Sequence, residues 1–263
     1  NGSSYKVVKY IFSEININLI YIKDKPNGRN INNKCGSLNP QSLIKEVKKK
    51  SADFGISFDG DGDRIICCDE KGKIIDGDKI LACLAEYIFN KSRSGVNAIA
   101  GTLMSNSGLE KFVNNIGLKF YRSNVGDKFV FELMKKNNCF LGGEQSGHII
   151  LKEFGACGDG ILIALYLIEI ISKYRKKTSE IFDLYKSYFQ IQKNIKLKES
   201  TLKKNKKINN FLRFYNNKRI DDVRILARLS GTEPVIRLLV EGKKYSKIIL
   251  LAKKLDKKIK SIV

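Results

Sequence analysis

The sequence predicts an α/β protein with a smaller α+β unit at its C-terminal end. Helical and strand-like patterns alternate between residues 40 and 175, which is typical of helices layered on a largely parallel sheet. Lysine and asparagine then become frequent, and this shift in composition places a domain boundary near Gln190. The 263 residues, 43% of them hydrophobic, are enough for more than one core. We therefore predict domains over residues 1–76, 77–188 and 189–263.

The first predicted domain begins with a short helix and ends with a hairpin. Leu43, Ile44 and Val47 have helical spacing, and "DFGISF" reads as a strand that runs directly into three aspartates. The full set of expected elements is a strand over 16–22, a loop from Pro26, a helix over 40–52, a strand over 53–58 and a hairpin over 64–76 that turns at Lys71–Gly72.

The second domain contains most of the alternating pattern. The apolar run from Gly160 to Ser172 contains Glu169 and is shorter than the roughly 20 residues of a membrane span, so we expect a buried helix capped by Asp159. The other expected helices cover 79–89, 107–117 and 127–137, and the expected strands cover 97–103 and 119–123, with a short strand before "GGEQSGH". The third domain should hold two strands around "RLSGTEP" and a helix over 245–259.

The charge is strongly positive, at +22 from 49 basic and 27 acidic residues. The lysines form no patterned stripe and accompany no nucleic-acid-binding motif, so we expect attraction for anionic sugar phosphates rather than nucleic-acid binding. The six cysteines show no C-x-x-C spacing, which indicates reduced thiols and a cytoplasmic protein. No membrane segment is predicted.

"DGDGDR" places Asp59, Asp61 and Asp63 on alternate positions before Arg64. Glycines allow these carboxylates to converge, and hard oxygen ligands suit Mg²⁺ or Ca²⁺. An EF-hand would need glycine where Arg64 stands and a helix where the preceding segment reads as strand. A solvated acidic turn is the other alternative. We predict a Mg²⁺ site.

"GGEQSGH" combines Glu144, Gln145 and Ser146 with His148, the chain's single histidine. Such a mixture offers hydrogen-bond partners for vicinal sugar hydroxyls. An ordinary polar turn with a packed histidine is an equal alternative. A glycine turn, "NVGDK", opens a nearby predicted helix and would place Lys128 beside an anion at the helix N-terminus.

"RLSGTEPVIR" brackets a hydroxyl-rich turn with two arginines. Guanidinium groups, hydroxyls and exposed backbone N–H groups together suit a phosphate dianion. A hairpin turn with incidental arginines is the alternative. The candidate phosphate ligands are Arg228, Ser230, Gly231, Thr232 and Arg237.

The order and spacing of these loops resemble the α-D-phosphohexomutase family, and the resemblance covers essentially the whole chain. The flanking stretches "PNGRNIN", "GTLMSNSGLE", "VGDKFV" and "LSGTEPVIRLLVEG" look like the bacterial branch that interconverts glucosamine 6-phosphate and glucosamine 1-phosphate. The resemblance implies two phosphohexomutase-type α/β domains, the first N-terminally truncated, and a C-terminal α+β domain. It also implies that a first domain carrying the phosphoserine donor is missing and would be a partner, because no "TASHNP"-like segment occurs here.

The resemblance further implies a role for each candidate residue. Asp59, Asp61 and Asp63 would hold Mg²⁺, and Arg64 would steady the transferred phosphate. Glu144 and Ser146 would bind sugar hydroxyls, His148 would assist proton transfer, and the C-terminal loop would hold the non-reacting phosphate.

Three alternatives stay open. The first is a phosphomannomutase or phosphoglucomutase, and Gln145 is evidence against it. The second is a non-catalytic remnant that binds sugar phosphate. The third is a basic nucleic-acid-binding protein, and the positive charge is the one feature that supports it.

Overall fold

A computed structural model describes residues 1–92, 95–197, 206–230 and 233–262. The chain divides into two compact units. Unit 1 comprises Asn1–Ser105 and Leu109–Tyr185, and unit 2 comprises Lys186–Val263 together with the short segment Asn106–Gly108. The predicted boundary at residue 76 falls inside unit 1 and stays a prediction.

The N-terminal part of unit 1 contains two helices and a small antiparallel sheet of order β1-β2-β3. The predicted hairpin turns where expected, because Gly72 has a φ of 76° and its N–H bonds to the Asp69 carbonyl. The elements are α1 (Tyr5–Ser13), α2 (Gln41–Lys50), β1 (Phe54–Phe58), β2 (Ile65–Asp69) and β3 (Ile74–Ile75).

The strand predicted over residues 16–22 is wrong. Among the described residues no strand forms there, although the apolar pattern is present and Leu19, Ile20 and Tyr21 are 36%, 57% and 38% exposed. A strand is stabilised by a neighbouring strand, and the sheet ends at β1 without including this segment. An apolar pattern alone therefore did not make this segment a strand.

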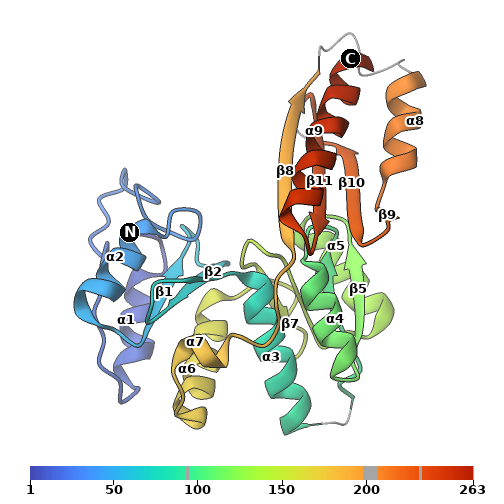
Figure 1. Ribbon diagram of the computed structural model, residues 1–263. Coiled ribbons are helices and arrows are strands. Elements are labelled where there is room, and N and C mark those ends of the chain that lie inside the picture. Colours follow the sequence, from blue (N-terminus) through green and yellow to red (C-terminus); the bar gives the residue numbers. More distant parts are fainter. Residues whose placement is uncertain (93–94, 198–205, 231–232, 263) are drawn as a thin grey trace. The chain divides into compact units, whose positions relative to one another are not determined.

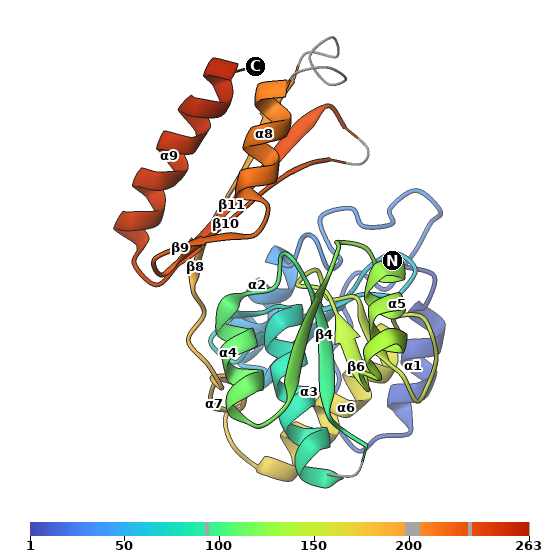
Figure 2. The ribbon, with the colours of Figure 1, turned by 90° about the vertical axis from the view of Figure 1, so that its right-hand side faces the viewer.

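The second part of unit 1 is a four-stranded sheet of order β5-β4-β6-β7 with helices on both faces. Side chains alternate along β4. Ala98 and Ala100 therefore pack with Val130 of α5, whereas Ile99 packs in the main core with Leu109 of α4. Figure 2 shows α4 and α5 on opposite sides of β4. The elements are α3 (Gly77–Lys91), β4 (Ala98–Thr102), α4 (Ser107–Asn115), β5 (Lys119–Ser123), α5 (Asp127–Asn137), β6 (Leu141–Gly143), β7 (Ile149–Leu151), α6 (Gly160–Tyr174) and α7 (Thr178–Ile181).

Unit 2 is an antiparallel sheet of order β8-β11-β10-β9 with two helices in contact with each other (Figure 1). Ile225 and Ala227 of β10 and Ile236 of β11 point into the core that α8 and α9 cover. The side chains at the alternate positions of each strand, including Arg228 of β10 and Arg237 of β11, therefore lie on the other face of the sheet. The elements are β8 (Phe189–Lys196), α8 (Lys206–Tyr215), β9 (Lys218–Ile220), β10 (Val223–Leu229), β11 (Val235–Gly242) and α9 (Tyr245–Ile262).

The predicted fold class, α/β followed by a smaller α+β unit, is confirmed. The sheets are less parallel than expected, because among the described strand pairs only β4–β5 and β4–β6 run parallel. Asp159 caps α6 as predicted, and it accepts hydrogen bonds from the N–H groups of Ile161 and Leu162. In the part of the chain that is described, no helix is both long and apolar enough to cross a membrane.

Candidate active site

The loop over residues 59–64, here called the aspartate loop, follows β1 directly and is shaped by hydrogen bonds to the Asp59 carboxylate. Asp59 Oδ1 accepts from the N–H groups of Gly62 and Arg64, both at 3.1 Å. Gly62 has a φ of 83°, which L side chains rarely adopt, so the turn requires glycine there. One oxygen each from Asp59, Asp61 and Asp63 lies within 4.8 Å of the other two. Because a strand precedes the loop, the EF-hand alternative is excluded.

The charge of this cluster is only partly balanced by the protein. The Arg64 Nε atom lies 3.8 Å from Asp59 Oδ2 and 3.7 Å from Asp63 Oδ1, too far for a hydrogen bond. Burial, and after it the neighbouring Asp63 carboxyl, raise the pKa of Asp59. Within the described residues, Asp63 Oδ1 is buried and has no hydrogen-bond partner. A buried carboxylate oxygen without a hydrogen-bond donor, in a cluster of three carboxylates, fits a hard divalent cation.

His148 connects the aspartate loop to the "GGEQSGH" loop. Its Nδ1 atom lies 2.9 Å from Asp63 Oδ2, and its Nε2 atom accepts the Gly158 N–H at 3.1 Å. Since Nε2 accepts, Nδ1 carries the proton and donates to Asp63. The imidazole is buried, with a relative side-chain exposure of 6%. Both ring nitrogens are therefore occupied.

The turn between β6 and β7 is held against two other elements by close backbone contacts. Gly147 has a φ of 93°, and a Cβ atom there would lie 2.0 Å from the Ile65 carbonyl oxygen. The Ile65 N–H donates to the Gly147 carbonyl at 3.0 Å. At the start of α3, the Gly77 N–H donates to the Gln145 carbonyl at 3.1 Å, and a Cβ on Gly77 would lie 2.0 Å from the Glu144 carbonyl oxygen. These two glycines fix the turn beside β2.

The side chains of this turn differ in their surroundings. Glu144 Oε1 accepts the Gly126 N–H at 2.9 Å, which places the carboxylate at the N-terminal end of α5, where Lys128 is exposed. Gln145 Nε2 lies 3.4 Å from Asp76 Oδ2. Ser146 is half-exposed at the tip of the turn.

The third predicted loop joins β10 to β11 in unit 2. Arg228 and Arg237 are directly opposed across the two strands, and burial followed by the charge of Arg237 lowers the pKa of Arg228. The Nε atoms of both arginines are buried and without a hydrogen-bond partner among the described residues. The Ser230 N–H donates to the Val235 carbonyl at 2.9 Å, while Gly231 and Thr232 lie outside the described residues. Two adjacent, incompletely bonded guanidinium groups favour an anion.

The structure brings together the candidates of the first two loops, which are about 85 residues apart in sequence. Sequence reasoning missed three residues that position them. Gly158 holds the His148 ring, Gly126 holds Glu144, and Asp76 contacts Gln145. The glycine of "NVGDK" and Gly158, which precedes the predicted cap Asp159, were visible in the sequence, but nothing there indicated which side chain each would meet.

The comparisons with known proteins agree across the chain. The family described as "Phosphoglucomutase/phosphomannomutase, alpha/beta/alpha domain II" matches residues 1–72, domain III of the same family matches residues 76–188, and its C-terminal domain matches residues 193–258.

Among curated relatives, the phosphoglucosamine mutase of Nautilia profundicola is 44% identical over 261 residues, which cover 99% of this chain and 59% of that protein. A phosphoglucomutase/phosphomannomutase family protein from Burkholderia thailandensis has a similar fold, with a TM-score of 0.82 at 22% identity over 99% of this chain and 58% of that chain. N-acetylphosphoglucosamine mutase of Aspergillus fumigatus, in complex with GlcNAc-6P and magnesium, has a TM-score of 0.77 at 18% identity, covering 98% of this chain and 60% of that chain. The chain spans 54–59% of the length of the first curated relatives that it matches.

Proposed function

The chain belongs to the phosphoglucomutase/phosphomannomutase family, and on that premise we propose that it forms the metal-binding and sugar-phosphate-binding part of a phosphoglucosamine mutase. The reaction is the interconversion of glucosamine 6-phosphate and glucosamine 1-phosphate, an isomerisation by phosphoryl transfer. The observation that carries this proposal is the contact, through Asp63 and His148, between the aspartate loop and the "GGEQSGH" loop, which we call the sugar loop. A phosphoryl-transfer site needs its metal and its sugar hydroxyls side by side.

The aspartate loop would hold Mg²⁺ through Asp59, Asp61 and Asp63. The ion would draw charge from the phosphoryl group during transfer. Arg64, whose side chain is 39% exposed, would bind the same phosphoryl oxygens. Because both ring nitrogens of His148 are occupied, we assign it the role of positioning Asp63, in place of the proton transfer that the resemblance suggested.

Glu144 and Ser146 would bind the hydroxyls of the sugar, with Lys128 adding positive charge at the end of α5. In unit 2, Arg228 and Arg237 would hold the phosphate that does not react, together with Ser230, Gly231 and Thr232. The lowered pKa of Arg228 supports this role, because a bound dianion would relieve the repulsion between the two guanidinium groups. Binding energy from this remote phosphate would position the reacting end of the sugar.

The phosphoryl donor implied by the family resemblance is a phosphoserine, and no segment like its loop occurs in the 263 residues. The serine would pass its phosphoryl group to one sugar hydroxyl and then take a phosphoryl group back from the other position. We therefore propose that these residues alone bind substrate without turnover. A cytoplasmic location, a role in cell-wall precursor synthesis and the absence of nucleic-acid binding stay predictions.

The alternative sugar specificities are those of phosphomannomutase and phosphoglucomutase. Gln145 favours glucosamine phosphate, and its amide is held beside Asp76 at the edge of the sugar loop. Comparing the affinities for glucosamine 6-phosphate, glucose 6-phosphate and mannose 6-phosphate would decide between these activities.

Calorimetry on the 263-residue chain tests the proposed metal site. We expect weak Mg²⁺ binding that Asp61→Ala weakens at least tenfold, because Asp61 offers the cluster's exposed carboxylate. Asp53→Ala is the matched control, since Asp53 is an exposed aspartate of the same unit outside the loop. Equal losses in the two variants, or tight Ca²⁺ binding in place of Mg²⁺, would contradict the assignment.

A further inference from the structure

Two neighbouring side chains of the sugar loop are held by the N-terminal ends of two different helices. Glu144 Oε1 accepts the N–H of Gly126, the residue that precedes α5, at 2.9 Å. The next side chain lies against α3 instead, where Gln145 Nε2 is 3.4 Å from Oδ2 of Asp76, the N-cap of that helix. The Gln145 amide is therefore directed to a different partner from the Glu144 carboxylate.

The backbone of the sugar loop is attached to α3 as well. The Gly77 N–H, at the start of this helix, donates to the Gln145 carbonyl at 3.1 Å. A Cβ atom on Gly77 would lie 2.0 Å from the Glu144 carbonyl oxygen and 2.9 Å from the Gly147 nitrogen, so the helix touches the turn directly. The first N–H groups of a helix have no partner within the helix. The sugar loop consequently supplies an acceptor that α3 needs.

The two carboxylate oxygens of Asp76 make different contacts. Oδ1 caps α3 by accepting the Lys79 N–H at 3.1 Å, whereas Oδ2 faces the Gln145 amide. Burial raises the pKa of Asp76, and the hydrogen bonds from the Lys79 N–H and the Gln145 amide partly offset this effect. Removing Oδ2 alone would therefore leave the helix capped and release Gln145.

We propose that Asp76 is a positioning residue for sugar binding, which holds the sugar loop on α3 through Gln145 and does not itself contact the sugar. The inference rests on the proposed function, because the sugar-binding roles of Glu144 and Ser146 belong to it. These two residues flank Gln145 in one turn, which the Gly147 N–H closes by donating to the Glu144 carbonyl at 3.0 Å. A shift of Gln145 would therefore displace both hydroxyl-binding side chains, and small displacements of such groups weaken binding.

Two variants of Asp76 in the 263-residue chain separate this contact from the helix cap. Serine and asparagine cap helices about as well as aspartate does, so Asp76→Ser and Asp76→Asn both keep the start of α3. Asp76→Asn also keeps a partner for Gln145, because the asparagine amide can donate to the Gln145 oxygen once that side chain flips. Asp76→Ser has no second oxygen or amide to reach Gln145, so this variant alone loses the contact.

Calorimetry with three sugar phosphates measures the effect. Asp76→Ser should weaken the binding of glucosamine 6-phosphate, glucose 6-phosphate and mannose 6-phosphate by the same factor, because the whole loop is displaced. We expect a factor of about ten, the lower end for a hydrogen bond to a charged group, since 3.4 Å is a long contact. Asp76→Asn should stay within about twofold of the original protein for all three, because it restores the partner of Gln145.

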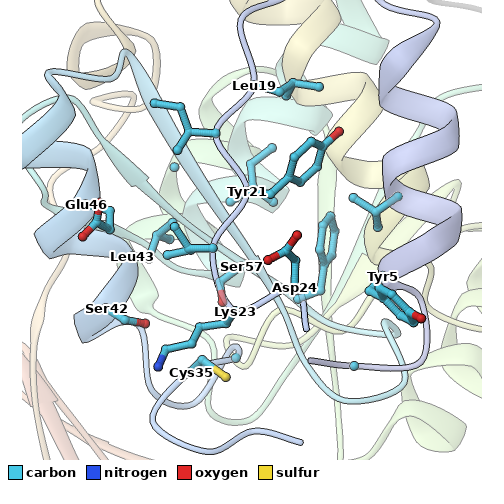
Figure 3. A pocket seen from close by; sticks show the side chains of 18 of the residues that line it. Tyr5, Leu19, Tyr21, Lys23, Asp24, Cys35, Ser42, Leu43, Glu46 and Ser57 are labelled. Atoms are coloured by element: carbon cyan, nitrogen blue, oxygen red, sulfur yellow. The ribbon is translucent and has the colours of Figure 1, made fainter. Parts of the chain in front are cut away.

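Glu46→Ser is the matched control, because it removes another half-buried carboxylate of unit 1. Glu46 belongs to α2 and lines the groove between α1 and α2 that Figure 3 shows. None of the described residues around this groove belongs to the sugar loop. The affinity of Glu46→Ser for the three sugar phosphates should therefore stay within about twofold of the original value.

A double-mutant cycle tests whether Asp76 acts through Gln145. Gln145→Met keeps the length of the side chain and removes the amide donor. If the two residues act through one contact, the double variant Asp76→Ser/Gln145→Met should bind glucosamine 6-phosphate as Asp76→Ser does. Losses that multiply in the double variant would mean that the two residues act separately, which contradicts the inference.

Amide exchange measured by NMR reports on the loop without any sugar. In Asp76→Ser the Gly77 N–H should exchange at least about tenfold faster, because its acceptor, the Gln145 carbonyl, belongs to the released turn. The Ile80 N–H donates to the Asp76 carbonyl at 3.0 Å within the first turn of α3, so it is the internal control for the helix and should change little.

Three further results would overturn the inference. They are equal losses of sugar affinity in Asp76→Ser and Asp76→Asn, a loss confined to glucosamine 6-phosphate, which would mean that the amino group of the sugar is contacted directly, and unchanged Gly77 exchange in Asp76→Ser. A chain that bound none of the three sugar phosphates would contradict the proposed function. The Gly77 exchange would then still decide whether Asp76 positions the loop.

Discussion

Replacing His148 with alanine is expected to weaken Mg²⁺ binding by roughly 10- to 100-fold, although His148 itself would not touch the ion. The imidazole donates from Nδ1 to Asp63 Oδ2 at 2.9 Å and is almost fully buried. Without this donor, the Asp63 carboxylate loses the hydrogen bond that fixes its orientation toward Asp59 and Asp61. A hydrogen bond to a charged group contributes about 1.5–3 kcal/mol. At roughly 1.4 kcal/mol per factor of ten, that range agrees with the expected loss in affinity.

His148→Asn separates orientation from simple packing. The Nδ2 atom of asparagine can take the place of imidazole Nδ1 and still donate to Asp63, whereas the acceptor for the Gly158 N–H is lost. Mg²⁺ affinity should therefore stay within about fivefold of the original protein in His148→Asn, because the donor is what orders the ligand. NMR titration with Mg²⁺ measures these weak affinities, and urea unfolding monitors the fold of each variant.

The reasoning would be refuted if a folded His148→Ala protein bound Mg²⁺ as well as the original. It would also be refuted if His148→Asn lost as much affinity as His148→Ala while both remained folded, since the lost affinity would then not depend on the donor to Asp63.

Four further predictions follow from the geometry of the two units. Arg228→Ala should weaken glucosamine 6-phosphate binding by roughly 1.5–3 kcal/mol in calorimetry, whereas Lys257→Ala on α9 should not; equal losses would argue against a specific phosphate site. Burial would raise the pKa of Glu241, but Arg224 and further hydrogen-bond donors outweigh it and lower the pKa. The stability that Glu241 contributes should thus be present at pH values above 4.5, the ordinary pKa of a glutamate, and should be lost as the pH falls through the lowered pKa of Glu241. Urea unfolding of Glu241→Gln should lack this acid-dependent loss of stability. Gly147→Ala should cost at least about 2 kcal/mol of unfolding free energy, because its backbone is left-handed and a Cβ would collide with a carbonyl oxygen; an unchanged urea midpoint would contradict the described turn. Given Mg²⁺ and a glucose 1,6-bisphosphate primer, the 263 residues alone should show no mutase turnover in a coupled assay, and robust turnover would reveal a nucleophile other than the implied phosphoserine.

Local chemistry made much of the molecule predictable. Hydrophobic periodicity indicated α2, α5 and α6 within a few residues, since an amphipathic or buried helix carries its pattern in adjacent turns. The hairpin at Lys71–Gly72 and the Asp159 cap depend on neighbouring residues and were also predicted. The clustering of Asp59, Asp61 and Asp63 belongs to the same class, because five consecutive residues contain all three carboxylates.

Local patterns were enough to indicate the chemistry of each loop, but contacts between distant parts of the chain decide which loops meet. The apolar pattern over residues 16–22 suggested a strand, but a ladder needs a partner strand, and none adjoins this segment among the described residues. His148 appeared as a candidate acid or base, and only the fold showed that Asp63 and the Gly158 N–H occupy its ring. Both outcomes depend on contacts between residues far apart in the chain, and such contacts are set by the packing of whole elements, which no local pattern encodes.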